Sequence, residues 1–316
     1  MSRNFLITAA SGNIGRELLP MLQSLDGARV ILPTSNAARL QKALPPPVDG
    51  ASAEFIVEEG SIRDPSWLQQ QLIKYEVDTV FLCLTGQDEL FTTMNILDCL
   101  ARSKVVKHLV YISACIDFIT PRGVQELLSH CSAGHILVKI ITEQKLLYGN
   151  LPYTWTILRP SLFFSNDLRT KRSMMGANMY SEPIGEKGVS RVAPSDIALA
   201  AKNSMVNNER WANKHVCVGT KKIYKGSEIA GLWSKAIGKD IKMLPITEEG
   251  FENFEKRIIP FTGPEQGREL RLMVEAFSSR KLEMSSEEYQ DQVELLGKEP
   301  ECYEAWIQQV GASWQE

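Results

Sequence analysis

The sequence Ile7-Thr8-Ala9-Ala10-Ser11-Gly12-Asn13-Ile14-Gly15 decides the fold of this chain. A short apolar run leads into these small residues, and leucines at helical spacing follow them. A strand that turns through small residues into a helix presents unpaired backbone N–H groups at the positive end of the helix dipole. Gly12 and Gly15 would let the backbone approach phosphates and the helix pack closely on its sheet. The stretch therefore predicts a binding site for the pyrophosphate of a dinucleotide.

The remainder of the first half alternates between strand-like and helix-like segments. Strands are predicted over residues 29–32, 55–57, 78–84, 108–113 and 154–158, and helices over 36–44, 65–74, 90–103 and 135–148. Regular alternation with short connections predicts an α/β fold, a doubly wound parallel sheet of the Rossmann type.

The alternation stops after residue 160. A further helix is expected over residues 196–206 and a further strand of the main sheet over 215–218, whereas the segment from residue 227 onward is mostly helical and more charged. We expect a dinucleotide-binding domain over residues 1–160, to which 189–224 returns. Residues 161–316 are expected to form a smaller, discontinuous, mostly helical substrate or lid domain.

Composition excludes several classes of partner. The 316 residues are 44% hydrophobic and 23% charged, which is ordinary for a globular protein. The net charge is −3 and no block of lysine and arginine is present, so neither nucleic acid nor a membrane surface is an expected partner. No apolar run is long enough to span a membrane. The six cysteines form no Cys-x-x-Cys pair, so we expect no metal site, no disulfide framework and a cytoplasmic location.

Three polar residues are candidates for chemistry at the sheet. Ser113 ends a predicted strand, while His135 and Lys139 lie four residues apart on the next predicted helix and so share one face. A serine at a strand's carboxyl end and a lysine on the neighbouring helix can converge on a nicotinamide ribose. The alternative is a solvated His135 at the start of the helix and an ordinary surface lysine. The dinucleotide turn favours a functional Lys139 and leaves both interpretations of His135 open.

Four segments resemble the NmrA-like branch of the atypical short-chain dehydrogenases and reductases. They are TAASGNIG at 8–15, HILVK at 135–139 with Glu143 after it, YTWTILRPSLFFSN at 153–166, and the pair GVSRVAPSDIA at 188–198 and KGSEIAGLWSKAIGK at 225–239. These segments span most of residues 5–245. The resemblance implies a cofactor of the NAD(P) type, and it connects the chain to the isoflavone-reductase-like enzymes.

Carried over position by position, the resemblance implies a set of cofactor contacts. They come from Ala9, Ser11, Gly12, Asn13, Ile14, Gly15, Ser35, Arg39, Ser61, Ile62, Leu84, Thr85, Lys139 and Pro160. Ala9 replaces the first glycine of the usual fingerprint, and Ser61 replaces an aspartate that usually contacts the adenine. No acidic residue follows the second strand to hold a free ribose 2′-hydroxyl, which favours NADP over NAD. The substrate would lie against Phe163, Phe164 and Asn166.

The main departure from the family pattern is at His135, where short-chain dehydrogenases generally have tyrosine. This His-x-x-x-Lys form occurs in dinucleotide-sensing regulators thought to lack dehydrogenase activity, whereas the lysine alone serves as acid and base in the isoflavone-reductase-like branch. The first hypothesis is an NADPH-dependent reductase of a carbonyl or conjugated double bond in a small apolar metabolite, with Lys139, His135 and Ser113 as catalytic residues. The alternatives are a non-catalytic NAD(P)-sensing regulator that binds a partner protein, and an isomerase or dehydratase.

Overall fold

The computed structural model describes residues 3–48, 50–84 and 88–314. Packing separates the chain into two compact units, which are described in turn. The first comprises Met1–Ser113, Ile141–Arg159 and Pro194–Val216, and the second comprises Ala114–Ile140, Pro160–Ala193 and Cys217–Glu316. Residues 114–140 thus pack within the second unit, although they precede the domain boundary expected at residue 160. Among the described residues, no helix combines the length and the apolar character that crossing a membrane requires.

The first unit is built on a seven-stranded sheet with the order β10-β6-β5-β4-β1-β2-β3. Its strands are β1 (Asn4–Ile7), β2 (Arg29–Thr34), β3 (Glu54–Glu59), β4 (Thr79–Leu82), β5 (His108–Ile112), β6 (Thr154–Pro160) and β10 (Lys214–Val218). Neighbours from β3 through to β6 pair in parallel. The doubly wound parallel sheet predicted from the alternation is confirmed, and β10 is the additional strand expected near residue 215.

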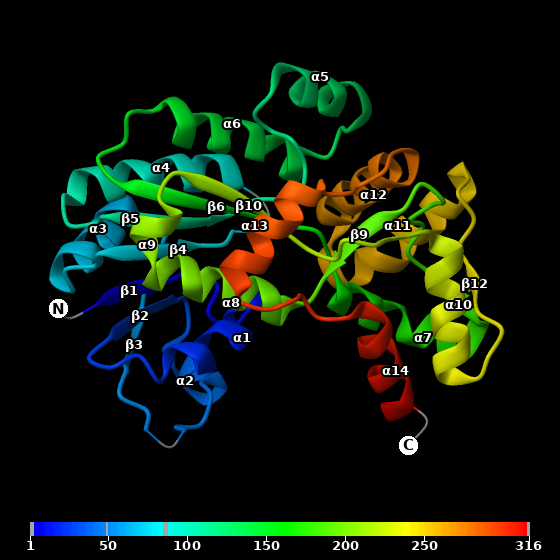
Figure 1. The fold of residues 1–316 in the computed structure, drawn as a ribbon, viewed down its shortest axis with the longest axis horizontal. Coiled ribbons are helices and arrows are strands. Elements are labelled where there is room, and N and C mark those ends of the chain that lie inside the picture. The colour runs from blue at the N-terminus through cyan, green and yellow to red at the C-terminus, as the bar shows by residue number, and fades with distance from the viewer. Residues whose placement is uncertain (1–2, 49, 85–87, 315–316) are drawn as a thin grey trace. The chain divides into compact units, whose positions relative to one another are not determined.

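Helices cover both faces of this sheet (Figure 1). On one face α1 (Asn13–Leu22) packs against α8 (Pro194–Val206), and on the other α3 (Pro65–Lys74) packs against α4 (Glu89–Ser103). The leucines of α1 recur at helical spacing and are all buried, and each buried leucine contributes about 1.5–3 kcal/mol to folding. Asp64 accepts hydrogen bonds from the first N–H groups of α3, where Pro65 lacks a donor, so this helix begins where the sequence predicts.

The strand order reverses direction at β1. The chain runs from β1 outward to β2 and β3, then returns to β4 on the other side of β1 and continues to β5 and β6. Connections that leave neighbouring strands in opposite directions open a crevice at the carboxyl edge of the sheet, which is where open α/β sheets bind ligands. The turn that follows β1 is therefore at the position in the first unit most suited to a ligand.

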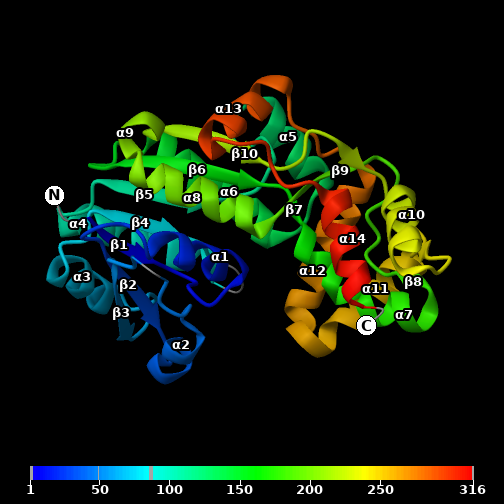
Figure 2. The same ribbon diagram turned by 60° about the horizontal axis from the view of Figure 1, so that its bottom comes forward.

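The second unit is mostly helical, and it is not smaller than the first. Its helices are α5 (Pro121–His130), the first part of α6 (Gly134–Tyr148), the 3-10 helix η1 (Phe164–Thr170), α7 (Lys171–Ala177), α10 (Gly226–Ile237), α11 (Glu248–Thr262), α12 (Pro264–Ser279), α13 (Ser286–Leu296) and α14 (Tyr303–Ser313). Short strands form two small sheets, β11 (Ile223–Tyr224), β9 (Val189–Val192) and β7 (Leu162–Phe163), and β12 (Lys242–Met243) with β8 (Met179–Tyr180). Figure 2 shows α14 alongside α10, with which it packs.

A buried polar network holds this second unit together. The Asp167 carboxylate accepts hydrogen bonds from the Tyr180 hydroxyl at 2.8 Å and the Trp233 indole N–H at 2.9 Å. It also accepts from the Tyr303 hydroxyl and pairs with the Arg191 guanidinium. All five side chains are buried. A buried carboxylate is tolerated only when charges and donors surround it, so these partners fix how η1, β9, α10 and α14 pack.

Candidate functional site

The turn between β1 and α1 is held against the neighbouring strand by Thr8. Its hydroxyl donates to the Phe81 carbonyl at 3.1 Å and accepts from the Cys83 N–H at 2.8 Å. These bonds join the carboxyl ends of β1 and β4 where the strand order reverses. Ala9 follows with a φ of 53°, in the left-handed region that glycine adopts without strain, and its carbonyl accepts the Gly12 N–H at 2.9 Å.

The two glycines of this turn stand where a side chain would not fit. A Cβ on Gly15 would lie 2.4 Å from the Ala10 carbonyl oxygen and 2.5 Å from that of Ala9. A Cβ on Gly12 would lie 3.1 Å from the Ala9 oxygen. Among the residues that the structure describes, no side chain caps α1, and its first turn carries no acidic residue. Bare N–H groups, a positive dipole end and an open backbone surface together fit the pyrophosphate of a dinucleotide.

The residues predicted to contact the adenosine ribose lie after β2, on the exposed surface of the first unit. Ser35 precedes α2 (Ala37–Ala43), Asn36 caps that helix by accepting the Arg39 N–H at 2.8 Å, and the Arg39 side chain is exposed. No acidic residue follows β2 directly in the sequence, but the structure brings one from the next strand. The Glu59 carboxylate accepts the Ala37 N–H at 2.8 Å. The parallel register that pairs Thr34 with Glu59 is what places it there.

The other predicted cofactor contacts follow β3 and β4 or end β6, and their surroundings differ. Ser61 is exposed after β3, where its hydroxyl accepts the Arg63 N–H at 3.2 Å. Ile62 and Leu84 are half-buried against the core of the first unit. Pro160 is buried at the end of β6, and its carbonyl accepts the Cys115 N–H at 3.0 Å. Thr85 lies outside the residues that the structure describes.

Ser113 belongs to a buried cluster at the carboxyl end of β5. Its hydroxyl donates to the Glu143 carboxylate at 2.5 Å, and the Arg159 guanidinium binds the same carboxylate with both its Nε and an Nη. The three side chains are buried. The cluster therefore ties β5, α6 and β6 together and fixes the Ser113 hydroxyl. Glu143 and Arg159 lie in segments that resemble the NmrA-like family, but the sequence alone does not show that they pair. Their ion pair forms only where α6 packs against β6.

His135 and Lys139 lie one turn apart on α6 and differ in their surroundings. Nδ1 of His135 lies 2.9 Å from the carboxylate of Glu269, on α12, and the His135 backbone N–H donates to the same oxygen at 3.0 Å. Glu269 thereby caps the first turn of α6 and orients the imidazole. Lys139 is 7% exposed, so it is not the surface lysine of the alternative interpretation. Lys139 and Glu143 are four residues apart and share a face of the helix.

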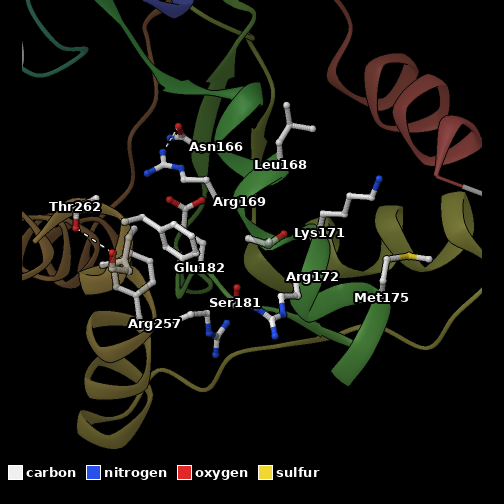
Figure 3. Close-up of a pocket in the computed structure, with 14 residues that line it drawn as sticks. Asn166, Leu168, Arg169, Lys171, Arg172, Met175, Ser181, Glu182, Arg257 and Thr262 are labelled. Atoms are coloured by element: carbon white, nitrogen blue, oxygen red, sulfur yellow. Dashed lines mark hydrogen bonds between the residues drawn. The ribbon is translucent and has the colours of Figure 1, made fainter.

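A cavity of about 620 Å³ lies within the second unit, and we call it the α7–α11 cavity (Figure 3). It is lined by Asn166, Leu168, Arg169, Thr170, Lys171, Arg172, Met175, Ser181, Glu182, Phe254, Arg257, Ile258, Phe261 and Thr262. Of the three predicted substrate contacts, Asn166 is in this lining. Phe164 instead is fully buried against the ring of Tyr303, with 4.8 Å between ring centroids. The Phe163 carbonyl accepts a bond from Arg191 at 3.0 Å.

Comparison with known proteins agrees with this description of the fold. A sequence model of the NmrA-like family matches residues 1–307. No curated protein sequence matches the chain. A nucleoside-diphosphate-sugar epimerase from Staphylococcus aureus has a similar structure, with a TM-score of 0.75, 18% identity, and coverage of 96% of this chain and 99% of that one.

Two further structures are similar over nearly the whole chain. An NADPH-dependent quinone oxidoreductase from Escherichia coli has a TM-score of 0.75 and 16% identity, covering 97% of this chain and 99% of that one. The negative transcriptional regulator NmrA, in complex with NADP, has a TM-score of 0.70 and 12% identity, covering 99% and 96%. At these identities the likeness establishes the fold, and an epimerase, a reductase and a regulator all use it.

Proposed function

The chain belongs to the NmrA-like family, and from this premise we propose that it is an NADPH-dependent reductase. Its substrate would be a small metabolite that carries a carbonyl or a conjugated double bond. The α7–α11 cavity carries this proposal, because a reductase needs a lined volume for a second ligand and a sensor of the dinucleotide alone does not. At about 620 Å³ the cavity is within the range of pockets that hold drug-sized molecules.

The turn after β1 supports the cofactor assignment. The N–H groups of Asn13, Ile14 and Gly15 are the first of α1, and within the described part of the chain no side chain caps this helix. The quinone oxidoreductase has been solved with NADPH and NmrA with NADP. Bound NADPH would supply a hydride to the electrophilic carbon of the substrate.

The chain's own residues would supply the proton. We assign this step to Lys139, whose ammonium would give one proton to the carbonyl oxygen, or to the carbon next to the carbonyl in a conjugated substrate. Hydride and proton together complete a two-electron reduction and leave the oxidised cofactor. Ser113 donates its proton to Glu143 at 2.5 Å, so it would act as a hydrogen-bond acceptor and position a ribose hydroxyl of the cofactor. His135 stays a predicted catalytic residue, positioned by Glu269.

The test is NADPH oxidation by the full chain with a panel of quinones, enones and ketones. We expect turnover with at least one class, and Lys139→Ala should lower kcat at saturating NADPH by a factor of about 100 or more. Lys145→Ala is the matched control, because Lys145 is an exposed lysine of the same helix. Full activity in Lys139→Ala would remove the assigned proton donor. NADPH binding without oxidation by any member of the panel would remove the reductase.

A second candidate is a regulator that binds NAD(P) and reports redox state to a partner protein. His135 favours it, because this residue replaces the usual tyrosine and its imidazole is bonded to Glu269 within the second unit. A regulator should bind NADP and NADPH with different affinities and turn over no substrate. Calorimetric titration of both dinucleotides beside the oxidation panel separates the two functions.

A further inference from the structure

The α7–α11 cavity combines an apolar wall with an excess of positive charge. Four of its lining side chains are cationic (Arg169, Lys171, Arg172 and Arg257), whereas Glu182 is its one acidic residue among those described. Helix α11 contributes Phe254, Arg257, Ile258 and Phe261, which recur at helical spacing and so form one face. The cavity is therefore not purely apolar.

The acidic residue already has positive neighbours. Glu182 is buried, and burial raises the pKa of its carboxyl group while the positive charges of Arg169 and Arg191 oppose that rise. The Tyr180 hydroxyl lies 3.4 Å from the same carboxyl. Arg169 also donates a hydrogen bond to Asn166, which holds its guanidinium on the side of the cavity where Glu182 lies (Figure 3). Glu182 thus interacts with Arg169 and Arg191, and it does not supply a counter-charge to the other two arginines of the cavity.

The other two arginines that line the cavity are Arg172 and Arg257. Their guanidinium groups point toward one another next to Ser181 (Figure 3). Arg257 donates to the Ser173 hydroxyl at 3.4 Å, which places it against α7, the helix that carries Arg172. Within the described parts of the chain, neither arginine forms an ion pair with a carboxylate. Burial lowers the pKa of Arg257 and no acidic side chain opposes that effect.

Partly burying the Arg257 guanidinium without a counter-charge costs free energy, which an anion between it and the exposed Arg172 would offset. Guanidinium groups bind carboxylates through paired hydrogen bonds, a geometry that lysine cannot match. Beside them, Phe254 and Ile258 are buried and Met175 is half-buried, which provides apolar contact for the rest of a ligand.

We propose that the α7–α11 cavity binds an organic carboxylate with an apolar or aromatic body, whose carboxylate group lies between Arg172 and Arg257. As the substrate class this rests on the proposed reductase, but the binding site itself does not. The apolar body would lie along Phe254, Ile258 and Met175. A neutral compound of the same shape would bind more weakly, and a cationic one would be excluded by the four positive side chains.

The experiment is a fluorescence titration of the full chain, without NADPH, using three pyrene probes of one shape and different charge. Pyrenebutyrate should bind about ten times more tightly than pyrenebutanol, and pyrenebutylamine should not bind measurably. Arg257→Gln and Arg172→Gln should each weaken pyrenebutyrate about tenfold and leave pyrenebutanol unchanged. Arg257→Lys should recover part of the loss, because it restores charge without the paired donors.

Lys256→Gln is the matched control, since Lys256 is the neighbour of Arg257 on α11 and is exposed beside Glu252. Equal affinity for the carboxylate and the alcohol would overturn the proposal, as would failure of all three probes to bind. An equal loss for both probes in Arg257→Gln would show an effect on folding and would also overturn it. Binding with this charge preference but no NADPH oxidation leaves the cavity assignment standing and removes the reductase. If neutral ketones support NADPH oxidation but the probes show no charge preference, the reductase stands and the cavity assignment is removed.

Discussion

The turn after β1 and the α7–α11 cavity are constructed in opposite ways. The turn is one continuous segment, and the groups proposed to bind the ligand there are backbone N–H groups at the start of a helix. The cavity is built from side chains of two segments, 166–182 and 254–262, that are far apart in the sequence. A site made of local backbone is visible in a short sequence pattern. A site made of side chains from distant segments becomes visible only once tertiary packing is known.

The largest expected effect concerns the buried network that holds the second unit together. Asp167→Ala would leave Arg191 as an unpaired buried charge and remove an acceptor from Tyr180, Trp233 and Tyr303. We expect a loss of about 3–5 kcal/mol in the free energy of unfolding, measured by denaturant titration. The loss should also abolish pyrenebutyrate binding while the first unit still binds NADPH. An unchanged unfolding midpoint would show that apolar packing alone holds the second unit together.

Acid should affect the first unit selectively. Burial lowers the pKa of His108 to about 4, and its ring nitrogens lie 2.8 Å from the Thr154 hydroxyl and 3.1 Å from that of Thr156. The unfolded chain takes up a proton near pH 6.5, whereas the folded chain does not until near pH 4. The stabilisation from neutral His108 is therefore complete above pH 6.5 and declines as the pH falls toward 4, by up to about 3 kcal/mol.

Unfolding free energies measured at intervals across this pH range check the expectation. His108→Gln lacks the titrating group and should flatten the dependence. An equally steep dependence in that variant would assign the acid sensitivity to groups other than His108.

Sequence patterns predicted the main sheet well because each of its elements carries its own signal. Apart from Thr79, β4 is apolar because it is buried on both faces, and Asp64 with Pro65 marks the start of α3. Glu59 was missed because the search for an acidic residue followed the chain after β2, whereas the register of the parallel sheet brings this one from β3. The order of strands in the sheet, once predicted, was the signal that could have found it.

The cavity was predicted only in part, for a related reason. Its segment after β6 was recognised as a candidate substrate region through Asn166, but the pattern could not separate buried Phe164 from lining residues. The positions of Phe254, Arg257, Ile258 and Phe261 form a helical face in the sequence, with an arginine among apolar residues. Nothing in that face alone shows that Arg172 lies opposite. Partners from distant segments are fixed by the packing of the whole unit.

At Gly15 the turn after β1 leaves no room for a side chain. Gly15→Ala places a Cβ 2.4 Å from a backbone oxygen, so the turn must deform. We expect a loss of about 1–3 kcal/mol in stability and a loss of NADPH binding, with pyrenebutyrate binding unchanged. Gly231→Ala is the control, since a Cβ there meets nothing within 4 Å. Retained NADPH affinity in Gly15→Ala would place the pyrophosphate elsewhere.

The smallest expected effect is a gain, at the position where the usual glycine is absent. Ala9 has a φ of 53°, which costs an L-amino acid about 1–2 kcal/mol relative to glycine. Ala9→Gly relieves that strain but increases the entropy of the unfolded chain, which offsets part of the gain. We expect a net stabilisation of about 0.5–1 kcal/mol, seen as a higher midpoint in denaturant. The free backbone N–H groups of α1 are the same in both variants, so NADPH affinity should change less than stability. A destabilised Ala9→Gly would mean that the alanine methyl group makes a contact that outweighs its backbone strain.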